Sequence, residues 1–139
     1  MEKLYTVSAT SVGGRSGHVS TDDGVLSLDL AAPREMGGPG GAANPEALFA
    51  AGYAACFNGA LNLVARMRRV RVGETRVTIA VSLGKDAQGN FRLGARIEAT
   101  VPGVDEAQAR ELVAAAHEVC PYSRATRGNI DVELQAHAG

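Results

Sequence analysis

Residues 44–57, NPEALFAAGYAACF, open the longest apolar run in the chain. Asn44 is a good N-cap, Pro45 suits the first helical position, and Glu46 places a negative charge in the first turn. The apolar run continues well beyond this stretch and is followed by arginines. The pattern therefore predicts a helix that runs from this cap to about Arg69.

This predicted helix is apolar on nearly all sides, and such a helix must be covered all round. One small sheet in a chain of 139 residues covers one of its faces. We therefore expect an obligate homodimer in which a second copy of the chain covers the rest. Four small residues would allow the two helices to approach closely: Gly52, Ala55, Gly59 and Ala60.

Alternating apolar and polar residues predict strands on both sides of this helix. The element order β-β-β-α-β-β-α-β indicates an α+β fold with a mostly antiparallel sheet, in a single domain over residues 1–139. The expected elements are strands within residues 1–30, a glycine-rich loop at 36–43, strands near 77–83 and 91–101, a helix from about 105 to 119 that Pro121 limits, and a last strand near 130–134.

Composition excludes several classes of partner. The formal net charge of -1 argues against nucleic acid or an anionic membrane as the main partner. Gly52, Asn58, Gly59 and Asn62 interrupt the apolar run, which argues against a membrane span. The first residues lack a signal-peptide pattern, so we expect a cytoplasmic protein whose thiols rest reduced.

The chain has two cysteines, Cys56 within the long predicted helix and Cys120 directly before Pro121. In a reducing compartment, one possible cysteine pair is typical of a transient redox couple rather than of a structural disulfide. Two inert core thiols are the alternative, because free cysteine is often buried. The two positions lie far apart in sequence, so only the fold can join them.

A redox role requires Cys56 to react as a thiolate, whereas an ordinary thiol has a pKa of about 8.5 that burial raises further. Cys56 follows Asn44 by three turns of helix, beyond the reach of the helix dipole, so a cation must stabilise the thiolate. Arg15 lies in the glycine-flanked turn VGGRSG, residues 12–17, and is a candidate for that cation. The alternative is a plain surface arginine in a hairpin turn.

Glu46 is the other candidate group, although it could serve only as a partner of the helix dipole. Glu46 and Cys56 are about 15 Å apart along a straight helix, so the two side chains cannot touch within one chain. A bent helix, an arginine between them, or Glu46 from a partner chain would bring the groups together. We favour a site shared across the dimer interface.

Other chemistries find no support in the sequence. His18, His117 and His137 lack the spacing of metal ligands and are interpreted as structural or exposed. The glycines at 37–41 lack the Lys-Ser/Thr ending of a phosphate-binding loop, and no Ser-His-Asp signature is present. We therefore expect neither a metal nor a cofactor.

Two blocks of sequence point to a family. Residues 44–57 resemble the peroxidatic motif of the organic hydroperoxide resistance proteins, a subgroup of the osmotically inducible protein C (OsmC) superfamily. Residues 119–130, VCPYSRATRGNI, resemble the resolving-cysteine motif of the same subgroup. The match extends over nearly the whole chain, including the Arg15 turn and the glycine-rich loop.

The resemblance implies an OsmC-like α+β fold, in which antiparallel sheets wrap around two central helices in an intertwined homodimer. It implies that Cys56 is the peroxidatic cysteine and Cys120 the resolving one. It further implies that Arg15 stabilises the thiolate and the departing alkoxide, and that Glu46 holds Arg15.

The implied activity is that of a thiol peroxidase, an antioxidant enzyme that reduces organic hydroperoxides through a sulfenic acid and a redox-active disulfide. Dihydrolipoamide, free or on a lipoylated protein, is the implied reductant. A carrier of apolar ligands and a thiol redox sensor are the competing interpretations. Four apolar side chains are expected to line a substrate pocket, with core packing as their alternative role: Met36, Phe49, Tyr53 and Phe57.

Overall fold

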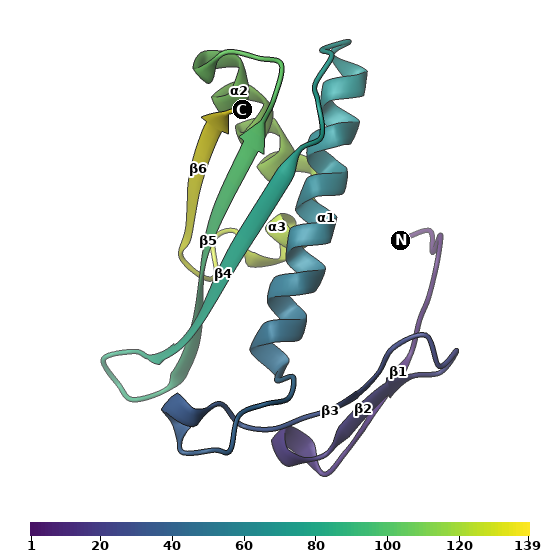
Figure 1. Ribbon diagram of the computed structural model, residues 1–139, viewed down its shortest axis with the longest axis vertical. Coiled ribbons are helices and arrows are strands. Elements are labelled where there is room, and N and C mark those ends of the chain that lie inside the picture. Colours follow the sequence, from purple (N-terminus) through teal and green to yellow (C-terminus); the bar gives the residue numbers. More distant parts are fainter. The chain divides into compact units, whose positions relative to one another are not determined.

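A computed structural model describes residues 1–139, which form two compact units, Met1–Leu48 and Phe49–Gly139. The long helix α1, Pro45–Met67, begins in the first unit and continues into the second (Figure 1). Asn44 caps this helix as predicted, because its side-chain oxygen accepts a hydrogen bond from the Ala47 N–H at 2.8 Å.

The first unit is a small antiparallel sheet in the order β1-β2-β3 (Figure 1). The predicted strands in the first thirty residues are confirmed. Leu30 is the one hydrophobic side chain that this unit buries, so the sheet has no core of its own. The elements of this unit are β1 (Ala9–Val12), the 3-10 helix η1 (Gly14–Ser16), β2 (His18–Thr21), β3 (Ser27–Asp29) and the 3-10 helix η2 (Arg34–Met36).

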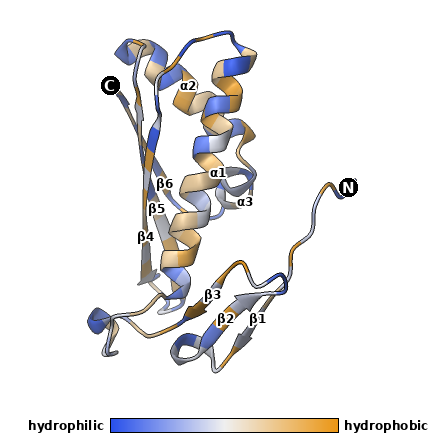
Figure 2. Ribbon diagram, turned by 45° about the vertical axis from the view of Figure 1, so that its right-hand side comes forward, coloured by the Kyte–Doolittle hydropathy of each residue, from blue (hydrophilic) through white to orange (hydrophobic).

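The second unit places its helices on one face of a second sheet, in the order β4-β5-β6 (Figures 1 and 2). β4 and β5 form the predicted antiparallel hairpin, and β6 runs parallel to β5. The predicted α+β class with mostly antiparallel pairing is confirmed. Besides α1, the elements of this unit are β4 (Arg76–Lys85), β5 (Phe91–Val101), α2 (Glu106–Val119), α3 (Pro121–Thr126) and β6 (Val132–Ala138).

The core of the second unit lies between this sheet and the helices. β5 and Ile79 of β4 contribute the strand side of the core, and α1 and α2 contribute the helix side. The fully buried large apolar side chains are Tyr53, Phe57, Leu61, Ile97, Val101, Leu112 and Val113.

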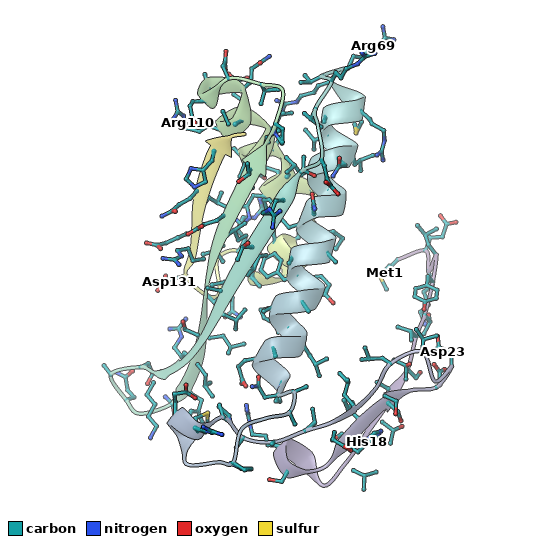
Figure 3. All side chains as sticks on the ribbon, in the orientation of Figure 1. Met1, His18, Asp23, Arg69, Arg110 and Asp131 are labelled. Atoms are coloured by element: carbon teal, nitrogen blue, oxygen red, sulfur yellow. The ribbon has the colours of Figure 1, made fainter.

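The last turn of α1 ends at Met67, two residues before the predicted end. Arg69 adopts a positive φ of 56°, and the Val70 N–H donates to the Ala65 carbonyl at 2.9 Å. Such a left-handed residue terminates a helix. Figure 3 shows Arg69 at this end of α1.

α1 has one face in the core and one face exposed. Ala51, Ala55, Gly59 and Leu63 are exposed and recur every fourth residue, on one side of the helix. Figure 2 shows that apolar residues extend along most of its length. The expectation of a helix that its own sheet covers only in part is confirmed.

The four small residues that were expected at a helix–helix contact differ in burial. Ala60 is buried in the chain's own core, and a Cβ on Gly52 would lie 3.1 Å from the Tyr122 hydroxyl. Only Ala55 and Gly59 are exposed. Ala60 and Gly52 therefore serve packing within the chain.

By length and composition alone, α1 is apolar enough to cross a membrane. Its polar residues, however, bond to a loop residue of the same unit. The Asn62 amide donates to Thr75 Oγ1 at 2.8 Å, and Thr75 Oγ1 donates to Asn58 Oδ1 at 2.6 Å. With six buried residues on its inner face, α1 is typical of a core helix.

Candidate active site

The fold brings the two cysteines together. Cys56 lies on α1 and is half-buried, and Cys120 lies between α2 and α3 and is fully buried. Their Sγ atoms are 3.6 Å apart, and both thiols are free. A disulfide bond is about 2.05 Å long, so a shift of about 1.5 Å would join the two sulfurs.

Cys120 lies at the bend between α2 and α3, and we call this bend the cysteine elbow. The Cys120 N–H donates to the Ala116 carbonyl at 2.8 Å and ends α2, and its carbonyl accepts from the Arg124 N–H at 2.9 Å and starts α3. Pro121 ends α2, as predicted, but it also occupies the first position of α3, which suits proline. α3 itself was not predicted, and it carries the backbone that reaches Cys56.

The surroundings of Cys56 within the second unit favour the protonated thiol. Burial raises the pKa of Cys56, and the hydrogen bond and the charge of Cys120 raise it further. The Tyr122 backbone N–H lowers the pKa of Cys56, but the net shift is upward. Any group that ionises this thiol must therefore come from outside this set of contacts.

Arg15 and Glu46 form an ion pair in the first unit. The two guanidinium nitrogens of Arg15 donate to the two carboxylate oxygens of Glu46 at 2.8 and 2.7 Å. Such a bidentate pair fixes the plane of the guanidinium and is among the stronger charge-assisted contacts. The pairing that the family resemblance implied is therefore present, between the η1 turn and the start of α1.

The pair is ionised on both sides. The hydrogen bond from Arg15 holds the pKa of Glu46 below its ordinary value, and Glu46 raises the pKa of Arg15. The Glu46 side chain is largely shielded, whereas that of Arg15 is 42% exposed and free to meet another group.

Acid should weaken this pair. Because the folded pKa of Glu46 is lowered, the pair stabilises the fold above the ordinary carboxyl pKa of 4.5, and this stabilisation is lost as pH falls below it. In urea titrations, the unfolding free energy of wild type should exceed that of Glu46→Gln at pH 7, and the difference should shrink toward pH 3. Glu35→Gln, at an exposed position, is the control and should show no such difference. A difference for Glu46→Gln that stays constant with pH would contradict the pairing.

The four apolar candidates are buried to different extents. Tyr53 and Phe57 are fully buried in the second unit, and Phe49 is half-buried beside Tyr53, with ring centroids 5.7 Å apart. Met36 is exposed and ends η2 in the first unit. Tyr122, which the sequence did not single out, completes an aromatic cluster with Phe49 and Tyr53 at 6.1 and 5.8 Å.

A set of polar side chains, three of them buried and one half-buried, joins the helices beside Cys120, and no sequence pattern predicted it. We call it the hydroxyl network: Tyr53, His117, Ser123 and Thr126. The Ser123 Oγ lies 2.8 Å from His117 Nδ1 and 2.9 Å from the Tyr53 hydroxyl. His117, which the sequence suggested to be structural or exposed, is half-buried and hydrogen-bonded within this network.

His18 bridges the first sheet. Figure 3 shows His18 in this sheet. Its Nδ1 lies 2.9 Å from Asp29 and its Nε2 lies 2.8 Å from Ser27, across adjacent strands. Asp29 is almost fully exposed, so this group is a surface link between strands. The structure contains no cluster of three or more His, Cys, Asp or Glu side chains arranged for a metal ion.

Residues 38–135 match the family model described as OsmC-like protein. The organic hydroperoxide resistance protein OhrB of Bacillus subtilis (strain 168) is 47% identical over 133 residues, which cover 95% of this chain and 97% of that protein. The chain belongs to the OsmC-like family, within its organic hydroperoxide resistance subgroup. The resemblance seen in the two sequence motifs is therefore confirmed.

Solved structures agree with this membership. A crystal structure of an organic hydroperoxide resistance protein from Legionella pneumophila is 51% identical, with a TM-score of 0.94 over 98% of this chain and 99% of that one. A structure from Vibrio cholerae, with captopril bound in one of its active sites, is 50% identical, with a TM-score of 0.92 over 97% and 93%. The OsmC-like fold is confirmed, and the homodimer stays a prediction.

Proposed function

We propose that this protein is a cysteine-based peroxidase that reduces organic hydroperoxides. The observation that carries the proposal is the pair of free thiols 3.6 Å apart, one half-buried on α1 and one buried beside it. The names of its relatives support the substrate class, because they are organic hydroperoxide resistance proteins.

In the first step, the Cys56 thiolate attacks the distal oxygen of R–O–O–H. The O–O bond breaks, an S–O bond forms, and the alkoxide takes a proton and leaves as R–OH. Cys56 is oxidised to a sulfenic acid while the hydroperoxide is reduced.

In the second step, the Cys120 sulfur attacks the Cys56 sulfenic sulfur. An S–S bond forms, and the hydroxyl group leaves as water with the Cys120 proton. A dithiol of the dihydrolipoamide class, free or on a lipoylated protein, then reduces the disulfide by thiol–disulfide exchange and returns both cysteines to thiols.

Arg15 is the cation proposed to ionise Cys56. The contacts of Cys56 within its own unit raise its pKa, so an added positive charge is required. Arg15 keeps an exposed guanidinium, and Glu46 fixes its orientation with two hydrogen bonds. The same charge would stabilise the alkoxide as it leaves.

Gly17 shapes the turn that presents Arg15. Its N–H donates to the Gly14 carbonyl at 3.1 Å, and a Cβ at Gly17 would collide with the Val12 carbonyl. We expect Gly17→Ala to lower peroxidase activity by displacing Arg15, measured as turnover of an alkyl hydroperoxide. Gly84→Ala is the control, because a Cβ there meets no neighbour, and it should retain full activity. Full activity in Gly17→Ala would contradict the role of this turn.

A second copy of the chain is proposed to complete the fold. The first unit buries only Leu30, while Leu4 and Val25 are 90% and 86% exposed. α1 also exposes an apolar stripe that ends at Leu63. Exposed apolar surface on this scale is typical of an obligate interface. Sedimentation of a stable monomer at micromolar concentration would contradict the dimer.

Subunit mixing tests whether the site is shared between chains. Arg15→Ala and Cys56→Ser, each inactive alone, should regain activity when co-expressed if Arg15 of one chain serves Cys56 of the other. One intact site in each mixed dimer would give roughly a quarter of wild-type activity for random pairing. No recovery in purified mixed dimers would place both groups in one chain.

The direct test of the proposed function is a single turnover. One equivalent of cumene hydroperoxide should convert both thiols to a disulfide, and dihydrolipoamide should restore them. Hydrogen peroxide should react more slowly, because Met36, Phe49, Tyr53 and Phe57 are proposed to favour an apolar substrate. A carrier would leave the thiols intact, and equal rates for both peroxides would contradict the apolar pocket.

We place this reaction in the cytoplasm, where dithiol reductants are kept reduced.

A further inference from the structure

The hydroxyl network joins the three helices that meet at the cysteine elbow. Tyr53 belongs to α1, His117 to α2, and Ser123 and Thr126 to α3. Tyr53 and Ser123 are fully buried, and Thr126 is 6% exposed. Buried polar groups at such a junction must be hydrogen-bonded, and all of these are.

The direction of every hydrogen bond in the network can be assigned by counting protons. Thr126 Oγ1 donates to the Ser123 carbonyl at 3.2 Å, which uses the only hydroxyl proton of Thr126. Thr126 must therefore accept from Tyr53 at 3.1 Å, which uses the proton of Tyr53. The Tyr53 oxygen must then accept from Ser123 at 2.9 Å.

This count leaves Ser123 Oγ without a proton for His117. The remaining bond of 2.8 Å is satisfied only when His117 Nδ1–H donates to Ser123 Oγ. Neutral His117 is thus the Nδ1–H tautomer. A protonated imidazole also carries a hydrogen on Nδ1, so the donor persists in both charge states.

The network spans the segment that holds the resolving thiol. His117 lies one turn before Cys120 on α2, and Ser123 lies three residues after it on α3. Both are tied through Tyr53 to α1, the helix that carries Cys56. The contacts therefore fix both arms of the elbow to the helix that the Cys120 sulfur must reach.

We propose that the hydroxyl network positions Cys120 against Cys56 for disulfide formation, with His117 and Ser123 as positioning residues. This inference rests on the proposed function, since it assigns Cys120 the resolving role. The network lets the elbow close by the short movement that the S–S bond requires, and it limits excursions that would separate the sulfurs.

The test measures the effective concentration of Cys120 toward Cys56 in the full-length protein. The protein is equilibrated with reduced and oxidised lipoamide, and the fraction of disulfide is read by thiol alkylation and mass. This readout needs no hydroperoxide. It therefore remains valid if the peroxidase proposal fails in the single-turnover experiment.

The paired variants His117→Asn and His117→Gln separate positioning from bulk packing. The asparagine amide can donate from the place of Nδ1, whereas the glutamine amide is displaced by one bond. We expect His117→Gln and Ser123→Ala to lower the effective concentration roughly five- to tenfold, which corresponds to the loss of one buried hydrogen bond. His117→Asn should stay within about twofold of wild type.

A matched control removes a hydroxyl elsewhere. Thr75→Val breaks the bonds to Asn58 and Asn62 on α1 but leaves the hydroxyl network intact. It should lower stability without changing the effective concentration. Equal effects of Thr75→Val and His117→Gln, or no effect of His117→Gln in a folded protein, would overturn the proposal.

A pH series tests the proton assignment. Burial lowers the pKa of His117, as does the charge of Arg127, while Glu118 raises it. Arg127 and Glu118 pair with each other at 2.6 Å. The ratio of wild type to His117→Asn in effective concentration should stay flat from pH 8 to pH 5, because Nδ1–H donates throughout. A ratio that falls on acidification would show that Nδ1 accepts, which overturns the assignment on which the network rests.

Discussion

Replacing Cys56 with serine should abolish turnover of organic hydroperoxides. A serine hydroxyl is not ionised near neutral pH, so no nucleophile remains to attack the O–O bond. Serine is close to cysteine in size, and Cys56 is only half-buried, so the fold should persist. The measurement is steady-state peroxide loss with dihydrolipoamide as reductant, with circular dichroism to establish folding.

Cys120→Ser is the matched variant and should separate the two steps. Cys56 should still consume one equivalent of hydroperoxide, because Cys120 is not the attacking thiol. The product should be a sulfenic acid that a dimedone probe labels, with no disulfide and no turnover by the dithiol route. Undiminished turnover in Cys56→Ser would refute the assignment of this cysteine as the peroxidatic one.

Replacing Arg15 with alanine should have the second largest effect. The variant loses the charge proposed to ionise Cys56 and to stabilise the leaving alkoxide. Removal of one such electrostatic group typically costs about 10²–10³ in kcat. We expect a loss of that order in kcat/KM for an alkyl hydroperoxide.

Two further arginine variants separate the effects of charge, of geometry and of net charge at Arg15. Arg15→Lys keeps the charge but loses the bidentate contact with Glu46, so its activity should lie between those of wild type and Arg15→Ala. Arg110→Ala removes an exposed arginine on α2 and should leave kcat/KM unchanged. A loss in Arg110→Ala equal to that in Arg15→Ala would indicate a general effect of net charge.

Local signals were enough to predict most elements of this fold. Asn44, Pro45 and Glu46 predicted the start of α1, and period-two alternation located β4 and β5. These features depend on neighbours within a few residues, and such patterns can be read directly from the chain. The end of α1 was predicted two residues too late, because the helix stops before the left-handed residue Arg69.

Features that depend on distant residues were not predictable. The parallel pairing of β6 with β5 depends on the crossover that α2 and α3 form between the two strands. The short helix α3 was not predicted. Pro121 could be read as a helix breaker, and it is one, but the same residue also starts the next helix.

The same distinction between local and distant residues applies to the candidate site. Cys56 and Cys120 could be named from their motifs, and the ion pair of Arg15 with Glu46 from the family resemblance. The bond between Tyr53 and Ser123 joins residues seventy positions apart, and no local pattern encodes it. Tyr53 was therefore expected in a substrate pocket, a role that stays a prediction, while its hydroxyl is engaged in the hydroxyl network.

In the proposed mechanism, an external guanidinium ionises a thiol whose own unit keeps it protonated. The most direct test of this ionisation is the titration of the Cys56 thiolate by absorbance at 240 nm in Cys120→Ser, with and without Arg15→Ala. With Arg15 present, the pKa of Cys56 should fall below neutrality, and Arg15→Ala should raise it above that of an ordinary thiol. If Cys56 stays protonated at neutral pH in both proteins, Arg15 does not ionise this thiol.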